Sequence, residues 1–150
     1  PYHATLAAQI ARLRARHSSV VVYDAHSIRS RIPRLFEGVL PHLNLGTNDA
    51  RSCDPSLTAA VVGAIRESGF THVVNGRFKG GYVTRHCGQP EAGVHAIQME
   101  IACRAYLDEP DAAPSAANWP PAFDPARAAP LRALLRDIRA ACVRFAQRAR

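Results

Sequence analysis

Polar residues that could take part in catalysis or bind a metal ion follow a short apolar run near the start of the chain. Residues 20–23 are three valines and a tyrosine, a composition typical of a buried strand. Asp24 and His26 come directly after them. Ligands of open α/β sheets bind outside the carboxyl ends of strands, and a neutral imidazole is a common zinc ligand. His26 is therefore a candidate metal ligand at a strand end. The alternative interpretation is a hydrogen-bonded loop histidine that binds no metal.

A second stretch, residues 75–86, mixes glycines with cations and polar side chains, and the ones that could contact a ligand are Asn75, Arg77, Lys79, Thr84 and Arg85. Arginine can clamp a carboxylate through two parallel hydrogen bonds, and lysine adds a point charge. We therefore expect an anion pocket for a carboxylated substrate. A solvated glycine-rich hairpin is the alternative. The spacing matches neither of the glycine motifs that bind phosphate groups of nucleotides.

A third stretch, residues 94–101, fits two kinds of element. As a helix it would carry a stripe of apolar residues. As a strand it alternates, and the alternation places Gln98 and Glu100 together on one face. The period favours the strand, with a helix beginning near Cys103.

The elements that must position these residues indicate an α/β fold. In chain order, the pattern predicts a helix over 2–17, a strand over 20–24, a long weakly periodic segment over 27–54, a second helix over 55–69 and a second strand over 70–74. Asp54 is the expected N-cap of the second helix, and Pro55 its first residue. Because a helix joins the two strands, we expect a parallel pair with a right-handed crossover. The long segment is either a loop that covers the substrate or a structural wrap.

The last part of the chain is predicted to be an irregular linker followed by one helix. Residues 108–125 contain five prolines, and we expect Trp119 and Phe123 to hold them against the body of the protein. A final helix follows over 126–148, and its inner face is expected to be Leu131, Leu134, Leu135, Ile138, Cys142 and Phe145.

Composition and charge exclude several functional classes. The chain has 150 residues, enough for one domain with a core, and no apolar run long enough to cross a membrane. The four cysteines contain no CxxC pair, which argues against a zinc ribbon or a thioredoxin site. With no secretory signal in view, we expect reduced thiols and a cytoplasmic location. The net charge of +7 permits nucleic-acid binding, but the arginine runs lack interleaved aromatic residues, so we expect no nucleic-acid partner.

The three stretches together resemble the carboxy-terminal half of the N-formylglutamate amidohydrolase family. The resemblance rests on residues 24–27, on the string NGRFKGGYVTRH at 75–86 with Gly88-Gln89-Pro90, and on Gln98-Met99-Glu100. It extends from about residue 1 to 109. It implies a mixed sheet flanked by helices, like the phosphorylase/hydrolase-like zinc carboxypeptidases. It also implies that residues 1–150 are the carboxy-terminal part of a single such domain.

The resemblance also implies a reaction and its residues. The family reaction is zinc-dependent hydrolysis of N-formyl-L-glutamate to formate and L-glutamate, a step of histidine degradation. His26 resembles a ligand of the zinc ion (Zn²⁺), and the other ligands are expected outside this chain. Glu100 resembles the carboxylate that activates the water, and Arg85 is expected to assist catalysis. The residues implied to bind substrate are Asn75, Arg77, Lys79, Thr84, Arg85 and Gln98. Cys87 stands where the family pattern has a tyrosine.

Two alternatives to this function stay open on the sequence. One is a related zinc deacylase or amidase for another acidic N-acyl amino acid. The other is an inactive remnant that serves as a structural or binding module, because a catalytic zinc ion usually needs three protein ligands. In either enzyme interpretation the partner is a small molecule.

Overall fold

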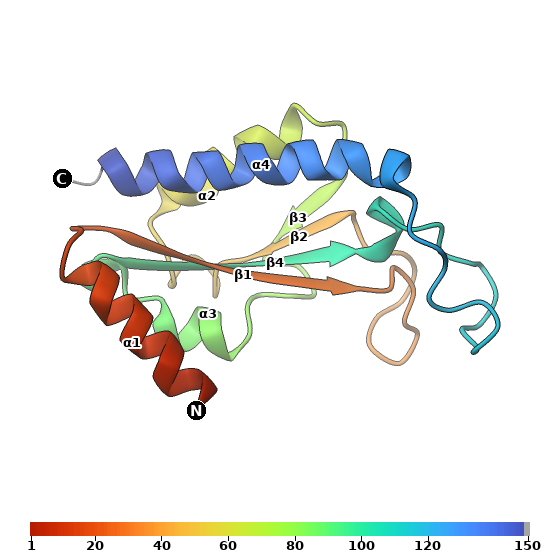
Figure 1. The fold of residues 1–150 in the computed structure, drawn as a ribbon, viewed down its shortest axis with the longest axis horizontal. Helices are drawn as coiled ribbons and strands as arrows, with labels where there is room; N and C mark the ends of the chain where they lie inside the picture. The colour runs from red at the N-terminus through yellow and green to blue at the C-terminus, as the bar shows by residue number, and fades with distance from the viewer. Residues whose placement is uncertain (149–150) are drawn as a thin grey trace.

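Four strands form one open, mixed sheet in the computed structural model, which describes residues 1–148 (Figure 1). The strands are β1 (Val20–Ile28), β2 (Leu43–Gly46), β3 (His72–Val74) and β4 (Val94–Ala102). Their spatial order is β1-β4-β2-β3; β1 and β4 are parallel, β4 and β2 antiparallel, and β2 and β3 parallel. The predicted α/β class with a mixed sheet flanked by helices is confirmed.

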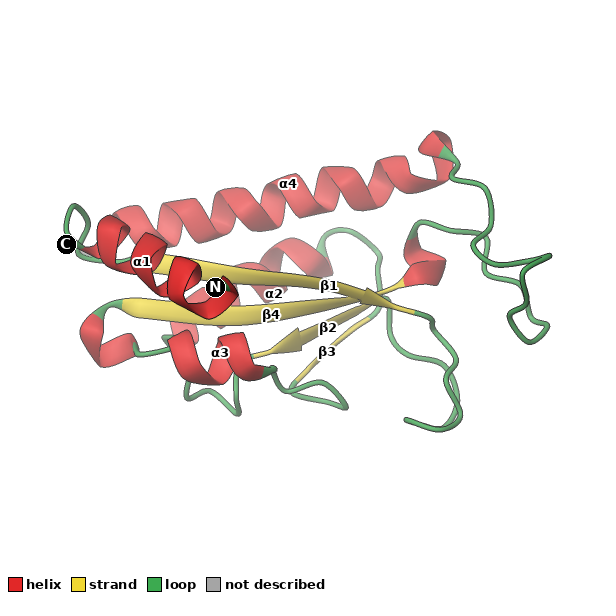
Figure 2. Cartoon of the chain, turned by 60° about the horizontal axis from the view of Figure 1, so that its bottom comes forward, coloured by secondary structure: helices red, strands yellow, loops and turns green. Residues whose placement is uncertain are grey.

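Helices cover both faces of the sheet. The helices α2 (Pro55–Arg66) and α4 (Pro125–Arg148) lie on one face, and α1 (Tyr2–Arg14) and α3 (Tyr82–Cys87) lie toward the other (Figures 1 and 2). Two short 3-10 turns, Pro90–Ala92 and Cys103–Ala105, flank β4. Among residues 1–148, no helix combines the length and the apolarity that crossing a membrane requires.

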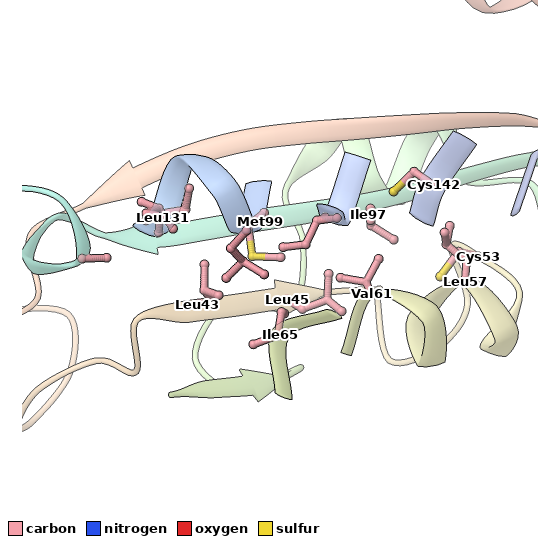
Figure 3. Close-up of a cluster of buried hydrophobic side chains, with 14 residues drawn as sticks. Leu43, Leu45, Cys53, Leu57, Val61, Ile65, Ile97, Met99, Leu131 and Cys142 are labelled. Carbon is pink, nitrogen blue, oxygen red and sulfur yellow. The ribbon is translucent and has the colours of Figure 1, made fainter. Parts of the chain in front are cut away.

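The hydrophobic core fills the space between the sheet and the α2/α4 layer (Figure 3). The sheet contributes Leu43, Leu45, Ile97 and Met99, and the helices contribute Leu57, Val61, Ile65, Leu131, Leu134, Ile138 and Cys142. Full burial of one such aliphatic side chain contributes about 1.5–3 kcal/mol to folding. Core residues therefore fix which face of each strand points away from α2 and α4.

Local signals fixed the start of α2 correctly. Asp54 is its N-cap, with Oδ1 accepting from the Ser56 N–H at 2.7 Å, and Pro55 is the first helical residue. The predicted inner face of α4 is also confirmed: Leu131, Leu134 and Ile138 are buried. The linker contacts the body of the protein through Trp119, as expected, whereas Phe123 differs from the expectation. The Arg29 guanidinium lies 5.2 Å from the Trp119 ring centroid, whereas Phe123 is 60% exposed.

The expected parallel pair of the first two predicted strands is wrong. Residues 20–28 and 72–74 lie at opposite edges of the sheet, because β2 and β4 stand between them. The strand β2 lies inside the segment that we expected to be irregular. It is four residues long and wholly buried, and its Leu43-Asn44-Leu45 alternation is too short to mark a strand in the sequence. The helix α2 therefore joins β2 to β3, its parallel neighbour.

Two further differences from the predictions concern the segments that carry the candidate site residues. The strand β1 continues to Ile28, so His26 lies within the strand rather than after it. Residues 75–81 form a loop without a hairpin, and the short helix α3 follows. The strand interpretation of residues 94–101 is confirmed, with β4 spanning Val94–Ala102.

Candidate active site

One face of the sheet is polar where β1 and β4 pair. Asp24 is in register with Gln98, and His26 with Glu100. Side chains of a strand alternate between its two faces, and Ile97 and Met99 point into the core. The four polar side chains therefore share the face opposite to α2 and α4. The site lies within the carboxyl-terminal halves of β1 and β4 rather than after the strand ends, which corrects our expectation for His26.

Glu100 is the most strongly perturbed acid of this face. It is 7% exposed, and its carboxylate makes no hydrogen bond with any residue in 1–148. Burial raises the pKa of Glu100, the nearby His26 opposes that rise, and Asp24 adds to it. A buried carboxylate with a raised pKa and free oxygens is suited to accept a proton.

His26 and Asp24 form a pair beside Glu100. The His26 Nε2 lies 3.0 Å from Asp24 Oδ1; the His26 side chain is 49% exposed, and that of Asp24 is 16% exposed. The two residues are separated by one position and point to the same side of β1. Asp24 can thus orient the imidazole ring. The other ring nitrogen has no partner among the described residues.

The side chains present could supply part of a zinc site, but they are too few to complete one. An exposed imidazole beside carboxylates has the right chemistry for a zinc ligand. However, no group of three or more His, Cys, Asp or Glu residues within 1–148 is arranged to hold a metal ion. This part of the chain can supply one histidine ligand to a zinc ion.

Gln98 positions the helix that covers the polar face. Its Oε1 accepts from the Gly81 N–H at 2.6 Å, at the N-cap of α3. This bond docks α3 onto β4 and β1. Cys87 is the last residue of α3. Burial, aided by Asp24, raises the pKa of the Cys87 thiol, which keeps it neutral. It cannot supply the phenolic hydroxyl of the tyrosine expected there.

The three cations of the glycine-rich stretch are exposed and tethered. The Arg85 Nη1 donates to the Gly80 carbonyl at 2.7 Å, and the Arg77 Nε donates to the Leu35 carbonyl at 2.8 Å. Lys79 is paired with a carboxylate, and the distance from its Nζ to Asp49 Oδ1 is 3.1 Å. Each arginine keeps free N–H groups after these bonds. The stretch can therefore still bind an anionic group.

Asn75 and Thr84 are placed as supports of that stretch. Asn75 has a left-handed backbone, with φ at 52°, and its side chain bonds Thr47 N–H and Thr47 Oγ1, both at 2.8 Å. Thr84 is fully buried, and its Oγ1 has no hydrogen-bond partner among residues 1–148. It packs so closely on Gly80 that a Cβ there would lie 2.6 Å from Thr84 Cγ2. Contact of either residue with a substrate stays a prediction.

Sequence reasoning missed two residues of β2 that shape the site. Asn44 is opposite Glu100, and its Nδ2 donates to the Glu100 carbonyl at 3.1 Å. Its buried Oδ1 has no hydrogen-bond partner in the part of the chain that the structure describes. Gly46 lets the loop approach, because a Cβ there would lie 2.5 Å from the Gly80 nitrogen. Only recognition of β2 as a strand could have revealed them.

Known proteins are similar to this chain in sequence and in fold. The model of the N-formylglutamate amidohydrolase family matches residues 1–107. N-formylglutamate deformylase of Pseudomonas aeruginosa is 54% identical, and that of Pseudomonas putida 50% identical, each over 110 residues. Those residues are 73% of this chain and 41% of each relative, so the chain spans less than half the length of these curated relatives.

A solved structure agrees with these matches at the level of the fold. N-formylglutamate amidohydrolase from Ralstonia eutropha JMP134 has a TM-score of 0.78 and 24% identity, over 100% of this chain and 51% of that one. The similarity includes the sheet and the helices on both of its faces. With the family model matching most of the sequence, the chain belongs to the N-formylglutamate amidohydrolase family.

Proposed function

We propose that the protein to which this chain belongs hydrolyses N-formyl-L-glutamate to formate and L-glutamate, as a cytoplasmic step of histidine degradation. Family membership and the names of the two curated relatives support the reaction. The observation that carries the proposal for this chain is Glu100. It is a buried carboxylate without a hydrogen-bond partner in the described residues, directly across from His26.

In this proposal Glu100 moves the proton. It takes a proton from the attacking water as oxygen bonds to the formyl carbon, and it returns a proton to the nitrogen as the C–N bond breaks. The products are formate and the free amino group of glutamate. Arg77, Lys79 and Arg85 bind the carboxylates, and an arginine N–H can stabilise the oxyanion of the tetrahedral intermediate. Gln98 holds α3, which carries Arg85.

We also propose that His26 is one ligand of a zinc ion (Zn²⁺) in the longer protein. An exposed imidazole oriented by a carboxylate is a common arrangement for a zinc ligand. The described residues supply no second and third ligand around it. The proposal therefore requires further ligands from outside residues 1–148, and it predicts weak zinc binding by this chain alone.

That incomplete ligand set is also the observation that favours a second candidate function. A chain with one metal ligand could serve as an inactive binding module that retains the anion pocket. A third candidate, a deacylase for other acidic N-acyl amino acids, differs only in the acyl group removed.

Formate release tests these candidates. Residues 1–150 and the longest protein expressed from the gene are each incubated with N-formylglutamate and with N-acetylglutamate. We expect the longer protein to release formate and to lose that activity when a chelator removes zinc. Release of acetate alone would support the deacylase instead. Binding of either substrate without turnover by any form would support the binding module.

A further inference from the structure

The two helices on the other side of the sheet enclose a groove that the candidate active site does not use. It lies between α2 and α4, which run beside each other above the sheet in Figure 1. Its volume is about 1100 Å³, which is large enough for a small organic molecule. The sheet separates the groove from Glu100, so a ligand here would not contact the candidate active site.

His95 supplies a buried donor to this groove. It lines the groove and is 6% exposed. Its Nδ1 accepts from the Asp54 N–H at 3.1 Å, and its ring meets Phe145 edge-on with centroids 4.8 Å apart. Since Nδ1 acts as an acceptor, the hydrogen of the neutral ring is on Nε2. That N–H has no hydrogen-bond partner in residues 1–148.

Two arginines line the groove near His95. Arg144 and Arg148 are four residues apart on α4 and flank Phe145 in sequence, so they lie on neighbouring turns of the helix. Neither forms an ion pair with a residue in the described chain. An arginine fork matches the oxygens of a carboxylate or a phosphate. The groove therefore offers N–H donors from three residues, one imidazole and two guanidinium groups, that have no acceptor within residues 1–148.

Three acidic residues, Asp54, Glu67 and Asp137, also line the groove, and Asp54 is the one beside His95. The Asp54 Oδ1 already accepts from the Ser56 N–H and hydroxyl at 2.7 and 2.6 Å. Asp137 precedes Arg144 by seven residues, about 10 Å along a helix. The α2 side of the groove is lined by small residues, among them Gly63. A Cβ at Gly63 would meet no atom within 4 Å, so there is open space beside it.

We propose that this groove binds a small molecule through an oxyanion group, a carboxylate or a phosphate. His95 Nε2–H and the guanidinium groups of Arg144 and Arg148 hold the oxyanion. The body of the ligand lies along the small residues of α2. The site is independent of the proposed hydrolase function, and it stands even if the chain hydrolyses nothing.

Titration of the 150-residue chain with inorganic phosphate and, separately, with succinate tests the site and tells the two oxyanions apart. Binding is followed by calorimetry and by the ¹⁵N resonances of the His95 ring. We expect saturable binding of at least one anion, with a shift of Nε2. The variant Arg144→Gln is expected to weaken it at least about fivefold, as for the loss of a charge-assisted hydrogen bond.

Two further variants make the test specific. Arg136→Gln removes the same charge from an exposed position of α4 that does not line the groove, and it should leave the affinity within about twofold. His95→Asn keeps an acceptor for the Asp54 N–H and removes the Nε2 donor, so it should act like Arg144→Gln. Equal weakening by Arg136→Gln and Arg144→Gln, or no saturation with either anion, would overturn the proposal. Arg144 is exposed, so its variant decides even if His95→Asn unfolds.

Discussion

Glu100 shows how one side chain can gain reactivity from its position. Its neighbours in the strand, Met99 and Ile101, are buried in the core, so β4 cannot shift to bring the carboxylate into water. Asn44 fixes the same residue from the other side through the Glu100 carbonyl. The carboxylate is therefore held in a poorly solvated place, where the charged form is disfavoured and its proton affinity is raised.

The first prediction at this scale concerns turnover. Glu100→Gln in the longer protein should lower the rate of formate release at least about 100-fold, because the amide cannot accept the proton of the attacking water. Substrate binding should change little. The matched control is Glu91→Gln, which alters an exposed glutamate in the turn before β4. Formate release by the Gln variant at the wild-type rate would remove Glu100 from the mechanism.

The same carboxylate predicts a pH dependence of stability. The pKa of Glu100 is raised in the folded chain, so the folded state binds more protons than the unfolded state between the ordinary and the raised pKa. Stability therefore falls as pH rises through that window. Glu100→Gln removes this loss, so the variant should gain stability relative to wild type from pH 4 to pH 7. Urea unfolding at both pH values measures the difference, and a pH-independent difference would contradict the assignment.

At the scale of the element, a glycine within α2 and another just after it have opposite roles. Gly63 is inside the helix and has open space where a Cβ would be, whereas Gly69 follows the helix with φ at 76°. Gly63→Ala should stabilise the chain by about 0.5–1 kcal/mol, because glycine lowers helix propensity. Gly69→Ala should destabilise it, because alanine is strained at positive φ. Urea midpoints for the two variants give the comparison, and a shift in the same direction for both would contradict it.

Elements with a local signal could be predicted, and elements formed by burial alone could not. The cap at Asp54 and the alternation of Gln98 and Glu100 are encoded within a few residues, so α2 and β4 were recognised. The strand β2 is buried on all four residues, and α3 is a six-residue helix after three glycines. Their conformations depend on contacts from distant segments, such as the bond from Gly81 to Gln98.

At the scale of the molecule, the candidate site is assembled by strand pairing. His26 and Glu100 are 74 positions apart, and they meet because β1 and β4 are parallel neighbours in one register. The family resemblance indicated that both residues belong to one site. The local pattern could not place them, since it predicted that β1 ends before His26 and pairs with residues 70–74. The roles of His26, Arg77, Lys79 and Arg85 in binding stay predictions.

The same topology leaves β1 at an edge of the sheet, and this predicts how the chain behaves in solution. Within residues 1–148, β1 pairs only with β4, so the outer side of a nine-residue strand has free N–H and C=O groups. Its sequence contains no proline, lysine or glycine that would block pairing. We expect the 150-residue chain to self-associate as its concentration rises, by adding one β1 edge to another.

A charge on that edge tests the expectation. Ala25→Lys places a lysine at an exposed position of β1, and Ala59→Lys adds the same charge at an exposed position of α2. Sedimentation velocity over a range of concentrations should show association of the wild type and of Ala59→Lys, and a monomer for Ala25→Lys. A wild type that stays monomeric, or equal association of both variants, would show that the β1 edge does not mediate self-association. Suppression by Ala25→Lys alone would locate the contact on β1, the strand that also carries His26.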